Sequence, residues 1–326
     1  MAIASKTPLH LLGKFSSPFI GAERELPDLA QCLAGRRETV LWSDAPPHPA
    51  FSAHGVRVIR PFAQDFPKGG MLLMGGVHVP LGIWLHHCRP ERVALRYNLP
   101  QHERLFSLIE HVRAVTGVEP ELLFASQALQ LSVGLPGVVE PSLIRLDAFL
   151  KTPVERPDRG VFTVGRASRD VPEKHHAEDA ALYRMLAAHG VRVRIMGGTC
   201  LASQLAGVAG IELLPTGAEE VSSFYRTLDA VLYRTGAFYE PYGRVVFEAM
   251  ASGLPVVAAS TGGYAEFLTQ EQDGFLFRTQ EEAFNLLMRL AADRPLRERV
   301  GHAARQRATA LHGAEAIEAM LQFYLT

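Results

Sequence analysis

Residues 239–265 read YEPYGRVVFEAMASGLPVVAASTGGYA, and this stretch decides how the second half of the chain folds. The pattern predicts a helix over residues 244–252 that begins directly after Gly243, followed at once by a buried strand in LPVVAAS. A helix that leads into an uncharged strand is typical of a parallel sheet in an α/β domain. The first N–H groups of such a helix have no internal acceptors, so a phosphate group fits there.

Two glutamates flank this helix start. Glu240 and Glu248 have seven residues between them, but Glu212 and Glu220 share that spacing, so spacing alone carries little information. Around Glu212 no glycine is placed to free backbone N–H groups near both acids, whereas Gly243 does so for the Glu240 pair. We interpret the Glu240 pair as part of a site for a phosphorylated sugar.

Short apolar runs alternate with helical patterns along the whole chain. Strand followed by helix, repeated, predicts a parallel sheet covered on both faces, so the fold class is α/β with two Rossmann-like domains. A cleft at the carboxyl ends of two facing sheets is where ligands bind in such folds. The expected strands begin near residues 9, 38, 55, 70, 92 and 121, and again near residues 160, 190, 210, 228, 254 and 274.

The alternation stops over residues 150–160, LKTPVERPDRG, where two prolines and mixed charges predict a linker. A chain of 326 residues holds two domains of ordinary size. We expect an N-terminal domain over residues 1–150, a second domain over 151–310, and a C-terminal helix over 311–326 that packs back toward the first domain.

Composition narrows the class of protein. Hydrophobic residues make up 48% and charged residues 21%, as in a folded globular chain, and the net charge of -1 indicates no nucleic-acid partner. Residues 1–15 contain no signal-peptide core, and glycines interrupt the uncharged stretch 69–85, which favours a strand, a turn and a helix start over a membrane span. Three scattered cysteines, Cys32, Cys88 and Cys200, favour a reducing compartment, so we expect the cytoplasm.

Candidate ligand-binding residues follow the predicted strand ends. In VGRASRDVPEKHH, Gly165 and Arg166 end a strand and Lys174 follows eight residues later. The arginine fork and the lysine point charge together could neutralise a diphosphate; alternatively they are solvated charges beside a turn. No His/Cys cluster has zinc spacing and no Asp-x-Asp pair occurs, so no catalytic metal is expected.

The first domain offers weaker candidates. Gly21 and Ala22 form a small-residue loop before an acidic helical turn, which suits a phosphate but equally a simple tight turn. His78 follows a buried strand, where a histidine is more often a hydrogen-bonded structural residue than a catalytic one. Asn98 occupies the same kind of strand-end position one unit later.

In these motifs the chain resembles the family-4 retaining glycosyltransferases of the GT-B fold, strongly in the second domain and less in the first. Four motifs fall in the family's order, and their joint occurrence is far more specific than any one of them. They are Gly165, Arg166 and Lys174; the glycine pair Gly197 and Gly198; the acid pair Glu240 and Glu248; and the glycine pair before Glu266.

The resemblance implies a role for each matching residue. It places Glu240 beside the donor sugar, Glu248 on the ribose hydroxyls, and Arg166 with Lys174 on the departing diphosphate. His78 and Asn98 are candidate catalytic residues, although Asn98 stands where the family commonly has a histidine, and asparagine cannot carry a proton. The remaining implied donor-binding residues are Gly21, Gly165, Gly197, Gly243, Arg244 and Val245, with Ala22 and Arg244 departing from the family's usual residue types.

The implied activity is transfer of a hexose-type sugar, with retention of configuration and without a metal or other cofactor, from a nucleoside diphosphate sugar to an acceptor. A UDP-sugar is the expected donor, with GDP- and ADP-sugars as alternatives; the acceptor is a glycan, a lipid-linked precursor or a surface polysaccharide precursor. Peripheral contact with the inner face of the membrane, the linkage formed and the oligomeric state stay open. So do two other functions: a GT-B nucleotide-sugar epimerase, and a catalytically degenerate nucleotide-sugar-binding protein, which Ala22 and Asn98 favour.

Overall fold

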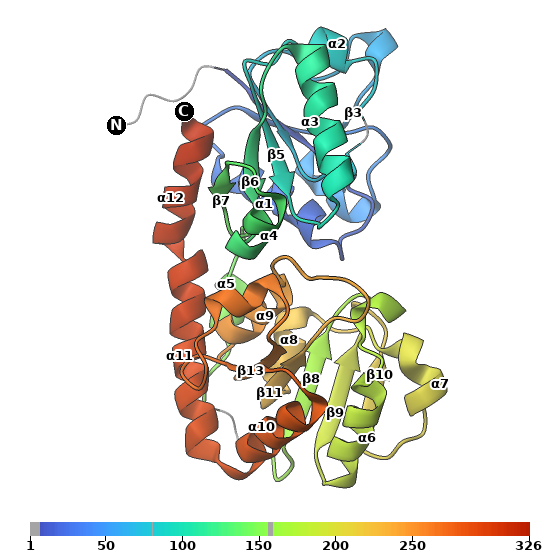
Figure 1. The fold of residues 1–326 in the computed structure, drawn as a ribbon, viewed down its shortest axis with the longest axis vertical. Helices are drawn as coiled ribbons and strands as arrows, with labels where there is room; N and C mark the ends of the chain where they lie inside the picture. Colours follow the sequence, from blue (N-terminus) through green and yellow to red (C-terminus); the bar gives the residue numbers. More distant parts are fainter. Residues whose placement is uncertain (1–6, 80, 156–158) are drawn as a thin grey trace. The chain divides into compact units, whose positions relative to one another are not determined.

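The computed structural model describes residues 7–79, 81–155 and 159–326, and its contacts divide the chain into two compact units. The N-terminal unit is Met1–Ile144 with Ala314–Thr326, and the C-terminal unit is Arg145–Gly313. Each unit is a parallel sheet with helices packed against it, which confirms the predicted fold class (Figure 1). Of the linker predicted over 150–160, residues 156–158 lie outside the described residues.

The N-terminal unit contains a seven-stranded sheet in the order β3-β2-β1-β4-β5-β6-β7, and every neighbouring pair is parallel. All six strands predicted for this half are present. The seventh, β7, was not predicted, because its two valines lie in GLPGVVEPS, where glycines and prolines predict a turn. The strands are β1 Leu9–Leu12, β2 Thr39–Ser43, β3 Arg57–Val58, β4 Met71–Met74, β5 Arg92–Tyr97, β6 Glu121–Phe124 and β7 Val138–Val139.

The last helix of the chain belongs to this unit. Leu321 and Tyr324 pack in the same apolar cluster as the β1 residues Leu9 and Leu11. The Tyr324 hydroxyl donates to Glu140 at 2.5 Å, so a buried polar contact also holds the helix. The helices of the unit are α1 Gly21–Cys32, α2 Leu85–Cys88, α3 His102–Thr116, α4 Gln127–Val133 and α12 Ala314–Leu325, with 3-10 turns η1 Pro49–His54 and η2 Pro61–Ala63.

The C-terminal unit contains a six-stranded parallel sheet in the order β10-β9-β8-β11-β12-β13. All six predicted strands of this half are present: β8 Thr163–Ala167, β9 Arg192–Met196, β10 Ile211–Leu214, β11 Ala230–Tyr233, β12 Val256–Ala259 and β13 Phe275–Phe277. The helices are α5 Asp147–Leu150, α6 Asp179–Ala188, α7 Ala202–Leu205, α8 Val221–Arg226, α9 Arg244–Ala251, α10 Gln280–Ala292 and α11 Arg294–His312, with 3-10 turns η3 Pro172–Lys174, η4 Thr199–Leu201 and η5 Gly263–Phe267.

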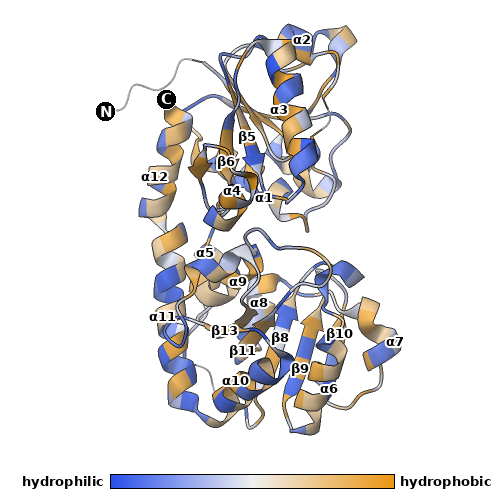
Figure 2. Cartoon of the chain, viewed as in Figure 1, coloured by the Kyte–Doolittle hydropathy of each residue, from blue (hydrophilic) through white to orange (hydrophobic). Residues whose placement is uncertain are grey.

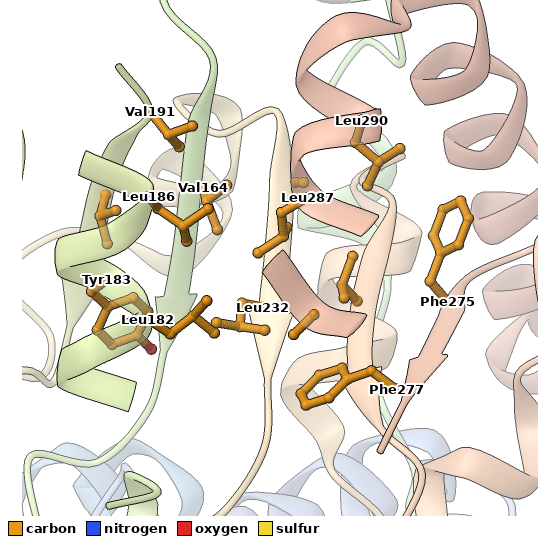
Figure 3. Close-up of a cluster of buried hydrophobic side chains, with 14 of the residues drawn as sticks. Val164, Leu182, Tyr183, Leu186, Val191, Leu232, Phe275, Phe277, Leu287 and Leu290 are labelled. Atoms are coloured by element: carbon orange, nitrogen blue, oxygen red, sulfur yellow. The ribbon is translucent and has the colours of Figure 1, made fainter. Parts of the chain in front are cut away.

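A cluster of apolar side chains from the sheet and from helices fills the core of this unit. Val164 of β8 and Leu232 of β11 belong to the same cluster as Leu182 of α6 and Leu287 of α10 (Figure 3). Helix α11 carries hydrophilic and hydrophobic residues in alternation, and it buries one face through residues four apart, such as Val300 (Figure 2). None of the described helices is both long and apolar enough to cross a membrane.

The order of the strands locates the ligand-binding edge of each sheet. The chain reverses direction across the sheet between β1 and β4 in one unit and between β8 and β11 in the other. Ligands of such sheets bind outside the carboxyl ends of the strands at this switch point. The loops after these four strands are therefore the places to look for a site.

Candidate donor site

An ion pair joins two strand ends at the switch point of the C-terminal unit. Lys174, in η3 after β8, places its Nζ 2.7 Å from the Oε2 of Glu240, in the loop after β11. The same carboxylate oxygen accepts a hydrogen bond from the Tyr233 hydroxyl at 3.0 Å. The side chains of Lys174 and Glu240 are only 14% and 15% exposed, so the carboxylate is fixed in place yet still reaches the surface.

The charge of Lys174 depends on its partner. Burial lowers the pKa of Lys174, while the neighbouring Glu240 carboxylate acts in the opposite direction. A desolvated ammonium loses stability, and an adjacent negative charge restores it. Glu240 therefore keeps a cation at the position where the sequence predicted one.

Gly243 begins α9 beside this pair. Its φ is +79°, a left-handed value, and a Cβ at this position would lie 2.8 Å from Cδ1 of Tyr264 and 3.5 Å from Cγ of Glu240. Only glycine fits there without strain. No side chain caps the helix at Gly243, so its positive end faces the region of Glu240. The predicted donors Arg244 and Val245 are the first two residues of this helix.

The second acid of the pair lies inside the unit. Glu248 belongs to α9 and is 1% exposed, so in this conformation it presents no surface to solvent. Glu212 and Glu220, which have the same spacing, are both used structurally. Glu212 forms an ion pair with Arg194 at 2.7 Å, and Glu220 caps α8 by accepting from the N–H of Ser223 at 2.9 Å.

Arg166, for which a diphosphate contact was predicted, is fully buried. Its guanidinium donates to the carbonyl oxygens of Arg234, at 2.6 Å, and of Lys174, and it lies 3.3 Å from the carboxylate of Asp179. The carboxylate of Asp179 is shared with Arg234, whose Nε lies 2.6 Å from it. Among the described residues, the Nε of Arg166 has no hydrogen-bond partner.

Two predicted glycines allow the backbone near these loops to pack closely. Gly165 lies in β8, where a Cβ would approach the Leu228 side chain to 2.5 Å. Gly197 has φ +83°, its N–H donates to the Leu214 carbonyl at 2.8 Å, and its own carbonyl lies 2.8 Å from Nε2 of His175. Both glycines permit close packing of the backbone, and neither uses a free N–H for a ligand.

The first-domain candidates follow the strand ends of the N-terminal unit. Nδ1 of His78, after β4, lies 3.3 Å from a guanidinium nitrogen of Arg104, and burial lowers the pKa of His78. Asn98, after β5, lies close to this loop, because its Oδ1 is 3.3 Å from the Cβ position of Gly76. Gly21 is the first residue of α1, which follows β1. These three residues belong to the N-terminal unit, and the Glu240 site belongs to the C-terminal unit.

Sequence reasoning missed Tyr233, Asp179 and His175. Each of them fixes a predicted residue: Tyr233 holds Glu240, Asp179 holds Arg166, and His175 contacts Gly197. Their partners lie between seven and 22 residues away in the chain, with no repeating interval. Only the position of Tyr233, at the last residue of a strand, was a usable signal.

Comparisons with known proteins agree with this fold. Residues 156–307 match the family model described as glycosyl transferases group 1. Sucrose synthase of Solanum tuberosum is 26% identical over 253 residues, which cover 75% of this chain and 28% of that protein. D-inositol 3-phosphate glycosyltransferase of Stackebrandtia nassauensis is 30% identical over 203 residues, covering 58% of this chain and 44% of that protein. The chain thus spans less than half the length of these relatives.

A solved structure has the same architecture throughout. Anabaena Alr3699/HepE in complex with UDP and glucose superimposes with a TM-score of 0.75 at 17% identity, covering 98% of this chain and 99% of that chain. The fold is therefore GT-B, the two-domain architecture of many glycosyltransferases. With the family match, the chain is similar to the group 1 glycosyl transferases over residues 156–307.

Proposed function

We propose that the chain is a retaining glycosyltransferase that moves a hexose-type sugar from a nucleoside diphosphate sugar to an acceptor. The expected donor is a UDP-sugar, and the expected acceptor is a glycan, a lipid-linked precursor or a polysaccharide precursor. One observation carries the proposal. The Lys174–Glu240 ion pair lies beside the uncapped start of α9 at the switch point of a parallel sheet. A cation and a helix N-terminus suit a diphosphate, and a fixed carboxylate next to them suits the sugar.

In the proposed reaction the bond between the anomeric carbon and the diphosphate oxygen breaks, and a bond from that carbon to the acceptor oxygen forms on the same face. The diphosphate leaves with the electron pair and takes the proton of the acceptor hydroxyl. Lys174 and the N-terminus of α9 stabilise the charge that develops on the diphosphate. Glu240 orients the sugar and favours positive charge at its anomeric carbon. No metal is needed in this scheme, because these groups supply the positive charge.

The comparisons support the proposal. Two relatives are named as a synthase of sucrose and a glycosyltransferase of inositol phosphate, and the HepE structure holds UDP with glucose. A second candidate is a nucleotide-sugar-binding protein without transferase activity. Two observations favour it: Arg166 is sealed from solvent, and Asn98 cannot carry a proton.

The test is release of nucleoside diphosphate from UDP-, GDP- and ADP-sugars, compared between the wild type and two variants. Glu240→Gln is expected to lower turnover about a hundredfold, the scale of losing one charge-stabilising group, while calorimetry still detects donor binding. Glu212→Gln is the matched control, since Glu212 has the same residue type and spacing but bonds to Arg194. Unchanged turnover in Glu240→Gln would refute the role of Glu240. Donor binding without release by the wild type would favour the binding protein, and an epimerised donor would favour an epimerase.

A further inference from the structure

A histidine and two cations lie close together at the carboxyl edge of the N-terminal sheet. His78, in the loop after β4, accepts a hydrogen bond at Nδ1 from the guanidinium of Arg104, in the first turn of α3, at 3.3 Å. Lys14 follows β1, the strand that pairs with β4, and its charge acts on His78 in the same direction as that of Arg104. The switch point of this unit therefore carries a cluster of Lys14, His78 and Arg104.

The cluster carries two positive charges that no acid neutralises. Burial lowers the pKa of His78, and Arg104 and Lys14 lower it further, so the imidazole is neutral near neutral pH. A guanidinium can only donate, so Nδ1 of His78 accepts and the ring hydrogen is on Nε2. Lys14 and Arg104 are both exposed, and among the described residues neither forms an ion pair with a carboxylate. Two such cations beside a neutral donor suit an anion.

The loop that carries Lys14 is held in a strained conformation. Phe15 has a φ of +50°, a left-handed value that is rare for a bulky residue, yet its side chain is fully buried in the apolar cluster of the unit. Glu23 fixes the next two residues, because its carboxylate accepts from the Ser16 hydroxyl at 2.9 Å and from the N–H of Ser17 at 2.8 Å. Such strain is costly, and it occurs most often at sites that bind ligands. Here it leaves Lys14 exposed between two buried neighbours.

We propose that this cluster binds a phosphate monoester carried by the acceptor. A monoester has close to two negative charges near neutral pH, which match the charges of Lys14 and Arg104, whereas a carboxylate has one. Arg104 offers a planar fork, Lys14 a point charge and His78 a further donor, and the phosphate oxygens can accept from all three. The assignment deepens the proposed function and rests on it, because the ligand of this unit is an acceptor only if the C-terminal unit binds the donor.

Calorimetric titration of the intact chain with methyl phosphate, acetate and UDP tests the assignment. Arg104→Gln and Lys14→Gln are each expected to weaken methyl phosphate binding about tenfold and to leave UDP binding unchanged. Arg104→Lys should recover part of the loss, because it retains the charge but not the fork. Arg113→Gln is the control: Arg113 is an exposed arginine in the last turn of the same helix, and its loss should leave all three affinities unchanged.

Two larger monoesters distinguish the possible sources of the phosphate. Glucose 6-phosphate represents a phosphorylated sugar, and decyl phosphate represents a phosphorylated lipid. The probe that resembles the acceptor should bind more tightly than methyl phosphate, and Arg104→Gln should weaken its binding by the same factor, because the phosphate contact is shared.

The outcomes separate this assignment from the proposed function. If the wild type binds methyl phosphate no better than acetate, or if both variants bind it as the wild type does, the assignment is overturned while the proposed function stands. If both variants lose as much affinity for UDP as for methyl phosphate, the cluster holds the donor, and its assignment to the acceptor is overturned. If the wild type binds none of UDP, GDP and ADP, the proposed function fails and the acceptor role of the cluster fails with it.

Discussion

His312, which contacts the loop that carries Glu240, makes the stability of the C-terminal unit depend on pH. His312 ends α11, is 2% exposed, and has its Nε2 2.8 Å from the hydroxyl of Tyr242. Tyr242 lies two residues after Glu240 and stacks on Phe247 with ring centroids 4.6 Å apart. Burial lowers the pKa of His312 from 6.5 to about 3, and the nearby Arg244 acts in the same direction. The folded C-terminal unit therefore keeps His312 neutral.

The sign of the effect follows from this lowered pKa. Below pH 6.5 the unfolded chain protonates this histidine, while the folded chain does not until about pH 3. The stability that His312 contributes is thus fully present above pH 6.5 and is lost as the pH falls toward 3. Between pH 7.5 and pH 5.5 the loss of stability is about 1.4 kcal/mol, because protonation of the histidine stabilises the unfolded state by about the free energy of one pKa unit over this range. This figure is set by the unfolded pKa, so any folded value near 3 gives the same result.

The perturbation is His312→Gln, which keeps a hydrogen-bonding group for Tyr242 but cannot titrate. Urea unfolding at pH 7.5 and pH 5.5 gives the free energy of unfolding. The two tryptophans, Trp42 and Trp84, both lie in the N-terminal unit, so fluorescence reports that unit and circular dichroism reports both. In the circular-dichroism transition of the C-terminal unit, the variant should lose about 1.4 kcal/mol less than the wild type between the two pH values.

A matched histidine on the same helix serves as the control. His302 also belongs to α11, but its side chain is 53% exposed, so His302→Gln controls for the loss of a histidine on the surface of the same helix. If His312→Gln loses as much stability as the wild type between pH 7.5 and pH 5.5, the reasoning is refuted. A lower stability of the variant at both pH values alike does not count, because glutamine also loses ring contacts with Tyr242 and Phe247.

Two further substitutions test the site and the last helix. Gly243→Ala should weaken UDP binding at least tenfold, because the new Cβ would lie 2.8 Å from Tyr264. Gly190→Ala is the control: Gly190 has the same φ of +79° but lies in open space, so this variant should bind UDP as the wild type does. Equal UDP affinities of the two variants would contradict the described start of α9. Tyr324→Phe should lower the free energy of unfolding of the N-terminal unit by about 1.5–3 kcal/mol, since Glu140 loses a hydrogen bond to a charged group. Tryptophan fluorescence during urea unfolding measures this loss, and an unchanged midpoint would contradict it.

The fold was predictable because its signal is local. A buried parallel strand needs a short run of apolar residues, and all twelve such runs became strands. Helix α9 begins at Arg244 as predicted, since Gly243 takes a left-handed φ that ends the preceding loop. The pattern failed for β7, because Val138–Val139 lies among glycines and prolines that predict a turn.

The candidate site was predictable where a glycine marks a backbone conformation that other residues cannot adopt. It was less predictable where side chains from different strands contact each other. Gly243 distinguished the Glu240 pair from the pair at Glu212 and Glu220, which indeed have structural partners of their own. The contact of Tyr233 with Glu240 depends on how the loop after β11 turns back, and no spacing rule predicts that turn.

The burial of Arg166 depends on a single residue of strand length. The sequence placed Arg166 at the end of its strand, next to solvent, but β8 runs through Ala167 and pairs Arg166 with Ile195 of β9. A residue within the central strand of a covered parallel sheet is enclosed on both faces, so its charge must be satisfied internally. Asp179, which Arg234 shares, and two carbonyl oxygens contact its guanidinium, and among the described residues its Nε has no hydrogen-bond partner. The first arginine beyond the strand is Arg169, and it is exposed.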